Sequence, residues 1–190
     1  PVTTNYMGLF GPGDYWEWSR EVDYVSNDTY VDPATPFAAR EYAFYCDLMR
    51  SLKNGQPFLQ MEQAPNGVQW RPRNATKRAG QYGLWSLQAV ARGCDGILNF
   101  QWRQSKAGAE AFHSGMVPHA GTDTRTWQEV VQLGKDLKKL GGVAGTRLDT
   151  RIALLWDWES WWAADTALVP LNDQETSLAL REWHGSLFEM

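Results

Sequence analysis

The chain has 190 residues, of which 43% are hydrophobic and 21% charged, a composition typical of one soluble globular domain with a sizeable core. Its formal net charge is −4 and no run of Lys or Arg stands out, which argues against a nucleic-acid partner. The longest apolar runs are too short to cross a membrane and no charged-then-apolar signal segment opens the sequence, so we expect a cytoplasmic protein.

The first third of the chain alternates strands and helices. Residues 1–8 contain several β-branched residues and predict a strand, and a Gly-rich turn separates them from a short helix over residues 15–21. A second strand follows over residues 22–30, with polar residues at its C-terminal tip. The next helix has Thr35 as its predicted N-cap, and Gly55 ends it.

A short apolar strand over residues 57–61 then places Glu62 at its C-terminal end. A loop punctuated by Pro, Asn and Gly carries Trp70 back toward the same place. Enzymes with parallel sheets present catalytic carboxylates in this way, at the end of an apolar strand. A solvated loop acid explains the local pattern equally well, so the rest of the chain has to decide.

The next strand–helix unit includes a long loop. Asn74 or Thr76 is predicted to cap a helix that runs to about Arg92. Residues 96–102 form a nearly continuous apolar run, as expected for a strand buried on both faces. The loop over residues 103–123 is long enough to be functional. It contains four polar candidates, Lys106, Glu110, His113 and His119.

A capping box predicts the start of the last helix of this series. It is formed by Thr126 and Glu129, and the helix runs to Leu140 before Gly141 and Gly142 stop it.

The remaining residues predict a second unit. Residues 143–150 are typical of a linker, and residues 151–157 predict a new strand followed by a Trp-rich helical turn. The chain begins without an initiator Met, and it ends at Met190 within a helical pattern that starts near Asp173. We therefore expect a fragment of a longer protein.

Two further features of the composition bear on a site. Cys46 and Cys94 lie in apolar segments, which favours buried thiols over a disulfide or a metal site. The chain has 11 Trp residues; some must be core, but Trp rings also stack on flat ligand faces such as sugar rings. The cluster from Trp156 to Trp162 fits core or subunit packing better than a sugar subsite.

Four strand–helix units with polar tips imply a parallel sheet with a site at its C-terminal edge. A doubly wound sheet often carries a phosphate-binding Gly-rich turn, but the sequence has no GxGxxG or P-loop motif. A (β/α)8 barrel needs eight units and only four are present. Half a barrel followed by the start of another domain is therefore the better prediction.

Short motifs occur along the chain in a fixed order. They are TNYMG at 4–8, VSNDTY at 25–30, MEQAP at 61–65, VQW at 68–70, QWRQS at 101–105 and GAEAFHSG at 108–115. Together they resemble glycoside hydrolase family 42, the bacterial β-galactosidases. The resemblance implies strands five to eight of a TIM barrel over residues 1–142, a linker over 143–150, and the truncated start of an α/β, glutamine-amidotransferase-like trimerisation domain over 151–190.

Carried over residue by residue, the resemblance implies that Glu62 is the catalytic nucleophile at the end of strand seven. Tyr30 matches the tyrosine beside the nucleophile, and Trp70 matches the aromatic residue that flanks the galactose site. Glu110 and His113 match residues that hydrogen-bond sugar hydroxyls. The acid/base glutamate of the family follows strand four, upstream of this segment, so we expect the fragment alone to be inactive.

The activity implied by the resemblance is hydrolysis of terminal, non-reducing β-D-galactosyl residues with retention of configuration. This reaction needs two carboxyl groups about 5–5.5 Å apart, one as nucleophile and the other as acid and then base. We expect a β-galactoside or galacto-oligosaccharide substrate and a homotrimeric parent. No redox cofactor, membrane or nucleic-acid partner is implied, and the four-cysteine zinc site of some relatives is not visible in this segment.

Several alternatives stay open at this point. The parent could act on β-L-arabinopyranosides or other hexosides, or it could be a catalytically dead homologue that binds galactosides or serves in assembly. Without the resemblance, Glu110 and His113 fit ordinary polar residues of a loop, and His119 matches no functional role. Asp28 fits a local turn cap better than a site residue.

Overall fold

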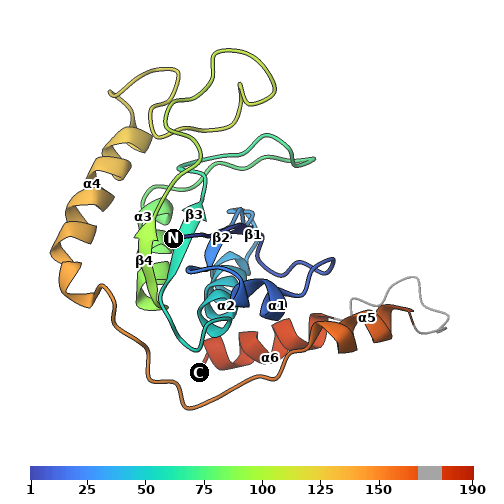
Figure 1. Ribbon diagram of the computed structural model, residues 1–190. Helices are drawn as coiled ribbons and strands as arrows, with labels where there is room; N and C mark the ends of the chain where they lie inside the picture. The colour runs from blue at the N-terminus through green and yellow to red at the C-terminus, as the bar shows by residue number, and fades with distance from the viewer. Residues whose placement is uncertain (167–176) are drawn as a thin grey trace.

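The chain, in a computed structural model that describes residues 1–166 and 177–190, is built around a parallel sheet. Its four strands lie side by side in chain order (Figure 1). The strands are β1 (Asn5–Tyr6), β2 (Ser26–Asp28), β3 (Phe58–Glu62) and β4 (Cys94–Ile97). The helices are α1 (Tyr15–Arg20), α2 (Ala38–Ser51), α3 (Gln81–Ala91), α4 (Arg125–Lys139), α5 (Trp158–Thr166) and α6 (Leu178–Phe188), with a 3₁₀ turn η1 (Gly141–Val143). The predicted α/β class with a parallel sheet is confirmed.

Helices α2 and α3 supply much of the hydrophobic core. Tyr42, Cys46 and Met49 of α2 recur at helical spacing and are buried in one cluster with Phe58 of β3. Tyr42 also stacks on Trp85 of α3, with ring centroids 5.5 Å apart. This packing fixes the sheet, and with it the residues at the ends of its strands.

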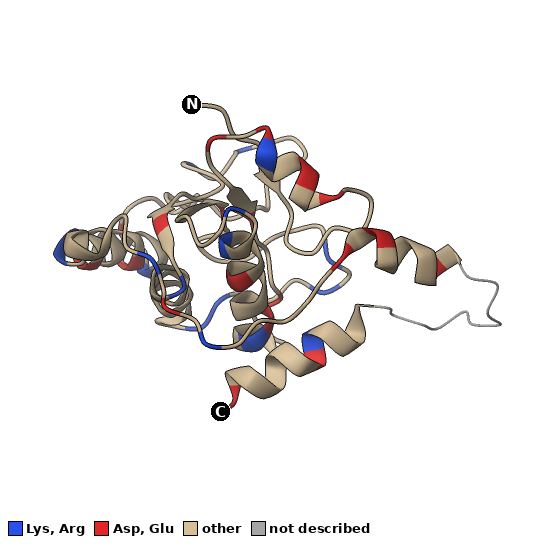
Figure 2. Cartoon of the chain, turned by 60° about the horizontal axis from the view of Figure 1, so that its bottom comes forward, with Lys and Arg blue, Asp and Glu red and all other residues tan. Residues whose placement is uncertain are grey.

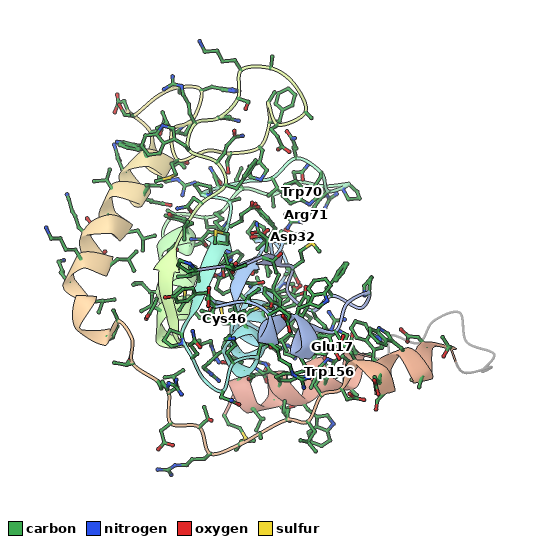
Figure 3. All side chains as sticks on the ribbon, in the orientation of Figure 1. Glu17, Asp32, Cys46, Trp70, Arg71 and Trp156 are labelled. Atoms are coloured by element: carbon green, nitrogen blue, oxygen red, sulfur yellow. The ribbon has the colours of Figure 1, made fainter. Side chains whose placement is uncertain are left out.

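Both cysteines lie in this core as buried free thiols. Burial raises the pKa of Cys94 to about 12, so the thiol stays protonated at neutral pH. Figure 3 shows Cys46 on α2, packed among the side chains beneath the sheet edge that carries the site.

Three helices begin later or earlier than predicted, and the N-caps of two of them, Phe37 and Gly80, make no side-chain capping bond. The helix α2 follows Phe37, and Thr35 bonds the backbone of the preceding turn. The helix α3 follows Gly80 rather than Asn74 or Thr76, because the Asn74 side chain bonds the backbone of Arg71 in the loop before it.

The capping box at the start of α4 was predicted two residues too late. Thr124 is the N-cap, and its hydroxyl accepts from the amide of Trp127. Thr126 is buried instead, where its hydroxyl accepts from the side chain of Asn66 at 3.2 Å. The hydroxyl that the pattern assigns to capping therefore ties α4 to the loop after β3.

The strand predicted over residues 96–102 is shifted toward its N-terminus. The ladder pairs Phe58 with Cys94 and ends at Ile97, although the amides of Leu98 and Phe100 still bond the backbone at the end of β3 and beyond it. The strand predicted over residues 151–157 is not formed. No described strand runs beside these residues, and a strand needs a partner for its backbone groups.

The C-terminal helices pack against the sheet unit. Trp158 of α5 is fully buried, its ring centroid is 5.4 Å from that of Tyr15, and its indole donates to the carbonyl of Phe10 at 2.9 Å. Trp158 thus serves core packing, and Trp156 and Trp161 pack against the same cluster. The helix α6 lies against α2 (Figure 1). The helical pattern predicted from Asp173 begins outside the described residues.

Charged residues of both signs are interspersed along the described elements (Figure 2). None of the helices in the described ranges is long and apolar enough to cross a membrane.

Candidate active site

Polar side chains at the carboxyl ends of β1, β2 and β3 come together at one edge of the sheet. Asp28 is the Cα partner of Glu62, with an irregularity in the register between Asn27 and Asp28. The strand β1 pairs with β2 on the other side, which places Asn5 beside the same edge. This edge is where parallel α/β proteins bind their ligands.

Glu62 receives hydrogen bonds from β1 and from the loop after β2. The Tyr30 hydroxyl donates to Oε2 at 2.6 Å, and Asn5 Nδ2 lies 3.5 Å from Oε1. Burial raises the pKa of Tyr30 well above its usual value, and its hydrogen bond to Glu62 raises the pKa further. Tyr30 therefore stays protonated, and it can act as a donor to an ionised carboxylate.

Asp28 belongs to this cluster and does not cap a turn, contrary to the interpretation from sequence. Asn5 Nδ2 donates to its Oδ2 at 2.9 Å across the two strands. Its Oδ1 is buried and has no partner among residues 1–166 and 177–190. Burial raises the pKa of Asp28 to about 6; the bond from Asn5 lowers it and the charge of Glu62 raises it.

Trp70 and His113 form an aromatic cluster with Tyr30, the residue that bonds Glu62. Trp70 is 53% exposed and packs edge-on against Tyr30, with centroids 4.9 Å apart. It also stacks on His113 at 5.1 Å, and the rings of Tyr30 and His113 are 5.8 Å apart. Figure 3 shows Trp70 on the loop above the sheet edge, beside Arg71 and Asp32. Trp70 thus lies beside Tyr30, whose hydroxyl bonds the Glu62 carboxylate.

The long loop after β4 brings His113 and Glu110 to the same place. His113 is fully buried, and its Nδ1 lies 2.9 Å from the carbonyl of Ser114, which can only accept. Nδ1 therefore carries a proton, and Nε2 has no partner in the described part of the chain. Glu110 accepts from Gln69 at 3.2 Å, and its charge adds to the raised pKa of Tyr30.

Two side chains to which the sequence patterns assign no role hold these loops. Gln69 donates to the carbonyl of Ala109 and accepts from the amide of Phe112 at 2.8 Å, so it joins the loop after β3 to the loop after β4. Arg71 donates to the carbonyl of Tyr30. Their partners lie about 40 residues away in sequence, which no local pattern reveals.

A buried lysine fixes the segment that follows Glu62. Lys77 Nζ donates to the carbonyls of Ala64 at 2.6 Å and Asn66 at 3.4 Å, and it lies 5.0 Å from the ring centroid of Trp85. Burial lowers its pKa to about 7. His119, by contrast, bonds the carbonyl of Ser105 at the surface, away from the cluster.

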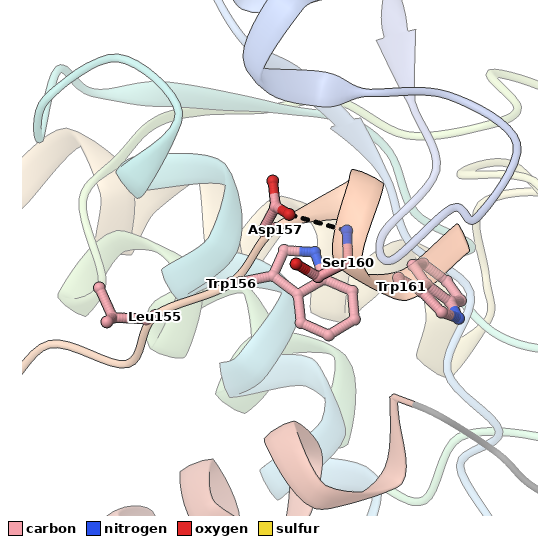
Figure 4. Close-up of a pocket in the computed structure, with 5 residues that line it drawn as sticks. All are labelled: Leu155, Trp156, Asp157, Ser160 and Trp161. Carbon is pink, nitrogen blue, oxygen red and sulfur yellow. Dashed lines mark hydrogen bonds between the residues drawn. The ribbon is translucent and has the colours of Figure 1, made fainter. Parts of the chain in front are cut away.

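Two of the cavities on the described surface lie near features discussed above. One of about 330 Å³ is bordered by Asp28, Tyr30 and Trp70, among others, so it adjoins the carboxylate cluster. The other, of about 470 Å³, lies around Trp156 and Trp161, where Asp157 caps the start of α5 through the amide of Ser160 (Figure 4). Within the described residues, no group of three or more His, Cys, Asp or Glu side chains is placed to hold a metal ion.

The predicted residues Tyr30, Glu62, Trp70, Glu110 and His113 thus meet around one carboxylate. The carboxylate has donors on both oxygens, and Trp70, His113 and Glu110 lie around Tyr30, one of these donors. Such a set can bind a polyhydroxylated ring and present an ionised carboxylate to it.

Comparison with known proteins matches this chain to one family. A model of glycoside hydrolase family 42, described as "Beta-galactosidase", matches residues 1–140. Beta-galactosidase BgaB of Geobacillus sp. (strain Y412MC61) is 48% identical over 173 residues, which are 90% of this chain and 26% of that protein. A beta-galactosidase of Arthrobacter sp. is 44% identical over 190 residues, which are 99% of this chain and 27% of that protein.

Solved structures show the same similarity. The cold-adapted beta-galactosidase of Rahnella sp. R3 superimposes with a TM-score of 0.94 at 40% identity, over 97% of this chain and 28% of that one. The beta-galactosidase of Bacillus circulans sp. alkalophilus gives 0.92 at 39% identity, over 98% and 28%. The chain spans about a quarter of the length of the relatives it matches.

Proposed function

Because the chain belongs to glycoside hydrolase family 42, we propose that it carries the nucleophile half of the active site of a retaining β-galactosidase. The full-length protein would hydrolyse terminal, non-reducing β-D-galactosyl residues by double displacement. Relatives that the chain matches at 44–48% identity are named beta-galactosidases, which supports this substrate.

The observation that carries the proposal is the 2.6 Å hydrogen bond from Tyr30 to Glu62 at the carboxyl end of the sheet. A nucleophilic carboxylate must be ionised and correctly oriented, and a phenol donor provides both conditions. Glu62 would attack the anomeric carbon. The second carboxyl group would come from a segment upstream of this chain, as the family resemblance implies, and would act first as acid and then as base.

The remaining residues would bind the sugar. The exposed face of Trp70 would pack against the C–H face of galactose, and Glu110 would accept from ring hydroxyls. His113 would accept a hydrogen bond from a sugar hydroxyl through Nε2, because its Nδ1 already donates to the carbonyl of Ser114.

We also propose the domain arrangement that the family resemblance implies. Residues 1–142 would form strands five to eight of a (β/α)8 barrel, 143–150 a linker, and 151–190 the start of a trimerisation domain. The four parallel strands in chain order support the first part. With one carboxyl group of the catalytic pair, the chain alone should show no galactosidase activity.

Covalent trapping tests the nucleophile. A 2-deoxy-2-fluorogalactoside with a good leaving group should form a stable glycosyl–enzyme with the full-length protein. Mass spectrometry should locate the sugar on Glu62. Glu62→Gln should abolish both labelling and turnover while the melting temperature stays the same. A label on another carboxylate, such as Asp28, or normal turnover by Glu62→Gln would overturn the assignment.

A further inference from the structure

We propose that Asp28 is a positioning residue for Glu62 and that it acts through the side-chain amide of Asn5. The inference rests on the proposed function of Glu62, and it concerns how that carboxylate is oriented. Neither the family match nor the sequence motifs assign a role to Asp28 or Asn5.

The first argument is the shared donor. Asn5 Nδ2 lies 2.9 Å from Asp28 Oδ2 and 3.5 Å from Glu62 Oε1, so its two N–H bonds can serve the two carboxylates at once. The bond to Asp28 is short and fixes the rotation of the amide. The remaining N–H is then directed at Glu62.

The second argument is the register of the sheet. Asp28 and Glu62 are Cα partners at the ends of adjacent strands, directly after the irregularity between Asn27 and Asp28. Irregularities of this kind redirect side chains near functional sites. Without the extra residue, Asp28 would not stand opposite Glu62.

The third argument is the environment of Asp28. Its Oδ1 is buried and finds no partner in the part of the chain that the structure describes, although buried polar atoms normally have one. An acid that served only to stabilise a turn would bond nearby backbone amides, and Asp28 makes its bond to a side chain 23 residues away. The carboxylate is therefore retained at a cost to stability, which a role in the site explains.

With Tyr30 on Oε2 and Asn5 on Oε1, both oxygens of Glu62 have a donor. Asp28 orients one of these two donors, the Asn5 amide at Oε1. The 3.5 Å separation is at the limit for a hydrogen bond, and we expect it to shorten when substrate binds, as catalytic hydrogen bonds often do.

A double-mutant cycle in the full-length protein tests the inference. Asp28→Ala and Asn5→Ala should each lower kcat for an aryl β-galactoside roughly tenfold to a hundredfold, with little change in KM. The double variant should be no slower than either single one, because both act through the same amide. Asp28→Asn keeps an acceptor for Asn5 and should restore most of the activity. Asp32→Asn, a nearby acid that caps its own turn, is the matched control.

The possible outcomes separate the two proposals. If Glu62→Gln abolishes turnover but the effects of Asp28→Ala and Asn5→Ala multiply, or Asp28→Ala has no effect, the positioning role is refuted and the proposed function stands. If Glu62→Gln turns over normally, the proposed function itself fails. A crystal structure of Asp28→Ala gives a readout without activity: the Asn5 amide should rotate away from Glu62, and an unchanged amide would overturn the inference.

Discussion

The hydroxyl of Tyr30 and the carboxylate of Glu62 lie 32 residues apart in the sequence and meet in a hydrogen bond of 2.6 Å. Tyr30 follows β2 and Glu62 ends β3, so the parallel pairing of the two strands creates this contact. The raised pKa of Tyr30 keeps its proton in place, so the hydroxyl donates and holds the Glu62 carboxylate in one orientation.

Tyr30→Phe should therefore weaken the nucleophile without removing it. We expect kcat/KM of the full polypeptide to fall roughly tenfold to a hundredfold, the value of a hydrogen bond to a charged group. An unchanged kcat/KM in Tyr30→Phe would contradict the role of this bond.

Much of this arrangement could be predicted from sequence. Apolar runs and caps locate the alternating strands and helices, and Glu62 was placed correctly at the end of its strand. Helix starts were less predictable: Thr126 and Thr124 are equally good caps by type, and the choice depends on Asn66, 60 residues earlier. Asp28 was misjudged for the same reason, because its partner Asn5 lies on another strand. The strand expected over residues 151–157 had the right apolar pattern, but a pattern cannot supply a neighbouring strand.

Lys77 should make the stability of the protein depend on pH. Burial lowers its pKa to about 7 in the folded state, whereas an unfolded lysine titrates near 10.4. Between these values the unfolded chain binds more protons, so the free energy of unfolding rises with pH. The free energy of unfolding can be measured by denaturation at pH 7 and pH 9. It should rise between these values in the wild type, by a few kcal/mol at most, and not in Lys77→Met. Parallel curves for the two proteins would contradict it.

Two glycines should respond to alanine in opposite directions. A Cβ on Gly115 would lie 2.5 Å from the amide nitrogen of Gln104, so Gly115→Ala should cost about 1–3 kcal/mol and disturb the loop that carries Glu110 and His113. Gly134 lies within α4 and has no atom within 4 Å of the added Cβ, so Gly134→Ala should stabilise by about 0.5–1 kcal/mol. Thermal melts measure both changes. A higher KM for the galactoside in Gly115→Ala alone would link the loop to sugar binding.

Asp47 should hold the C-terminal helix in place. Its Oδ2 accepts from Arg92 at 2.5 Å and lies 2.8 Å from Nε2 of His184, which joins α6 to α2 and to the end of α3. The Asp47 side chain is 19% exposed and that of His184 is 11% exposed, so these bonds are partly shielded from water. Asp47→Ala would leave Arg92 and His184 without this acceptor, at a cost of about 1–3 kcal/mol.

Hydrogen exchange can locate this cost. In Asp47→Ala, the amides of α6 (Leu178–Phe188) should exchange about tenfold faster or more, while those of β3 keep their protection, because α6 is held to the sheet unit through these side chains. Asp136→Ala is the control, since Asp136 pairs with Lys139 on the surface of α4, and exposed pairs contribute about 0–1 kcal/mol. Equal exchange in α6 of wild type and Asp47→Ala would show that other contacts, such as the Arg40–Glu182 ion pair at 2.8 Å, suffice to dock this helix.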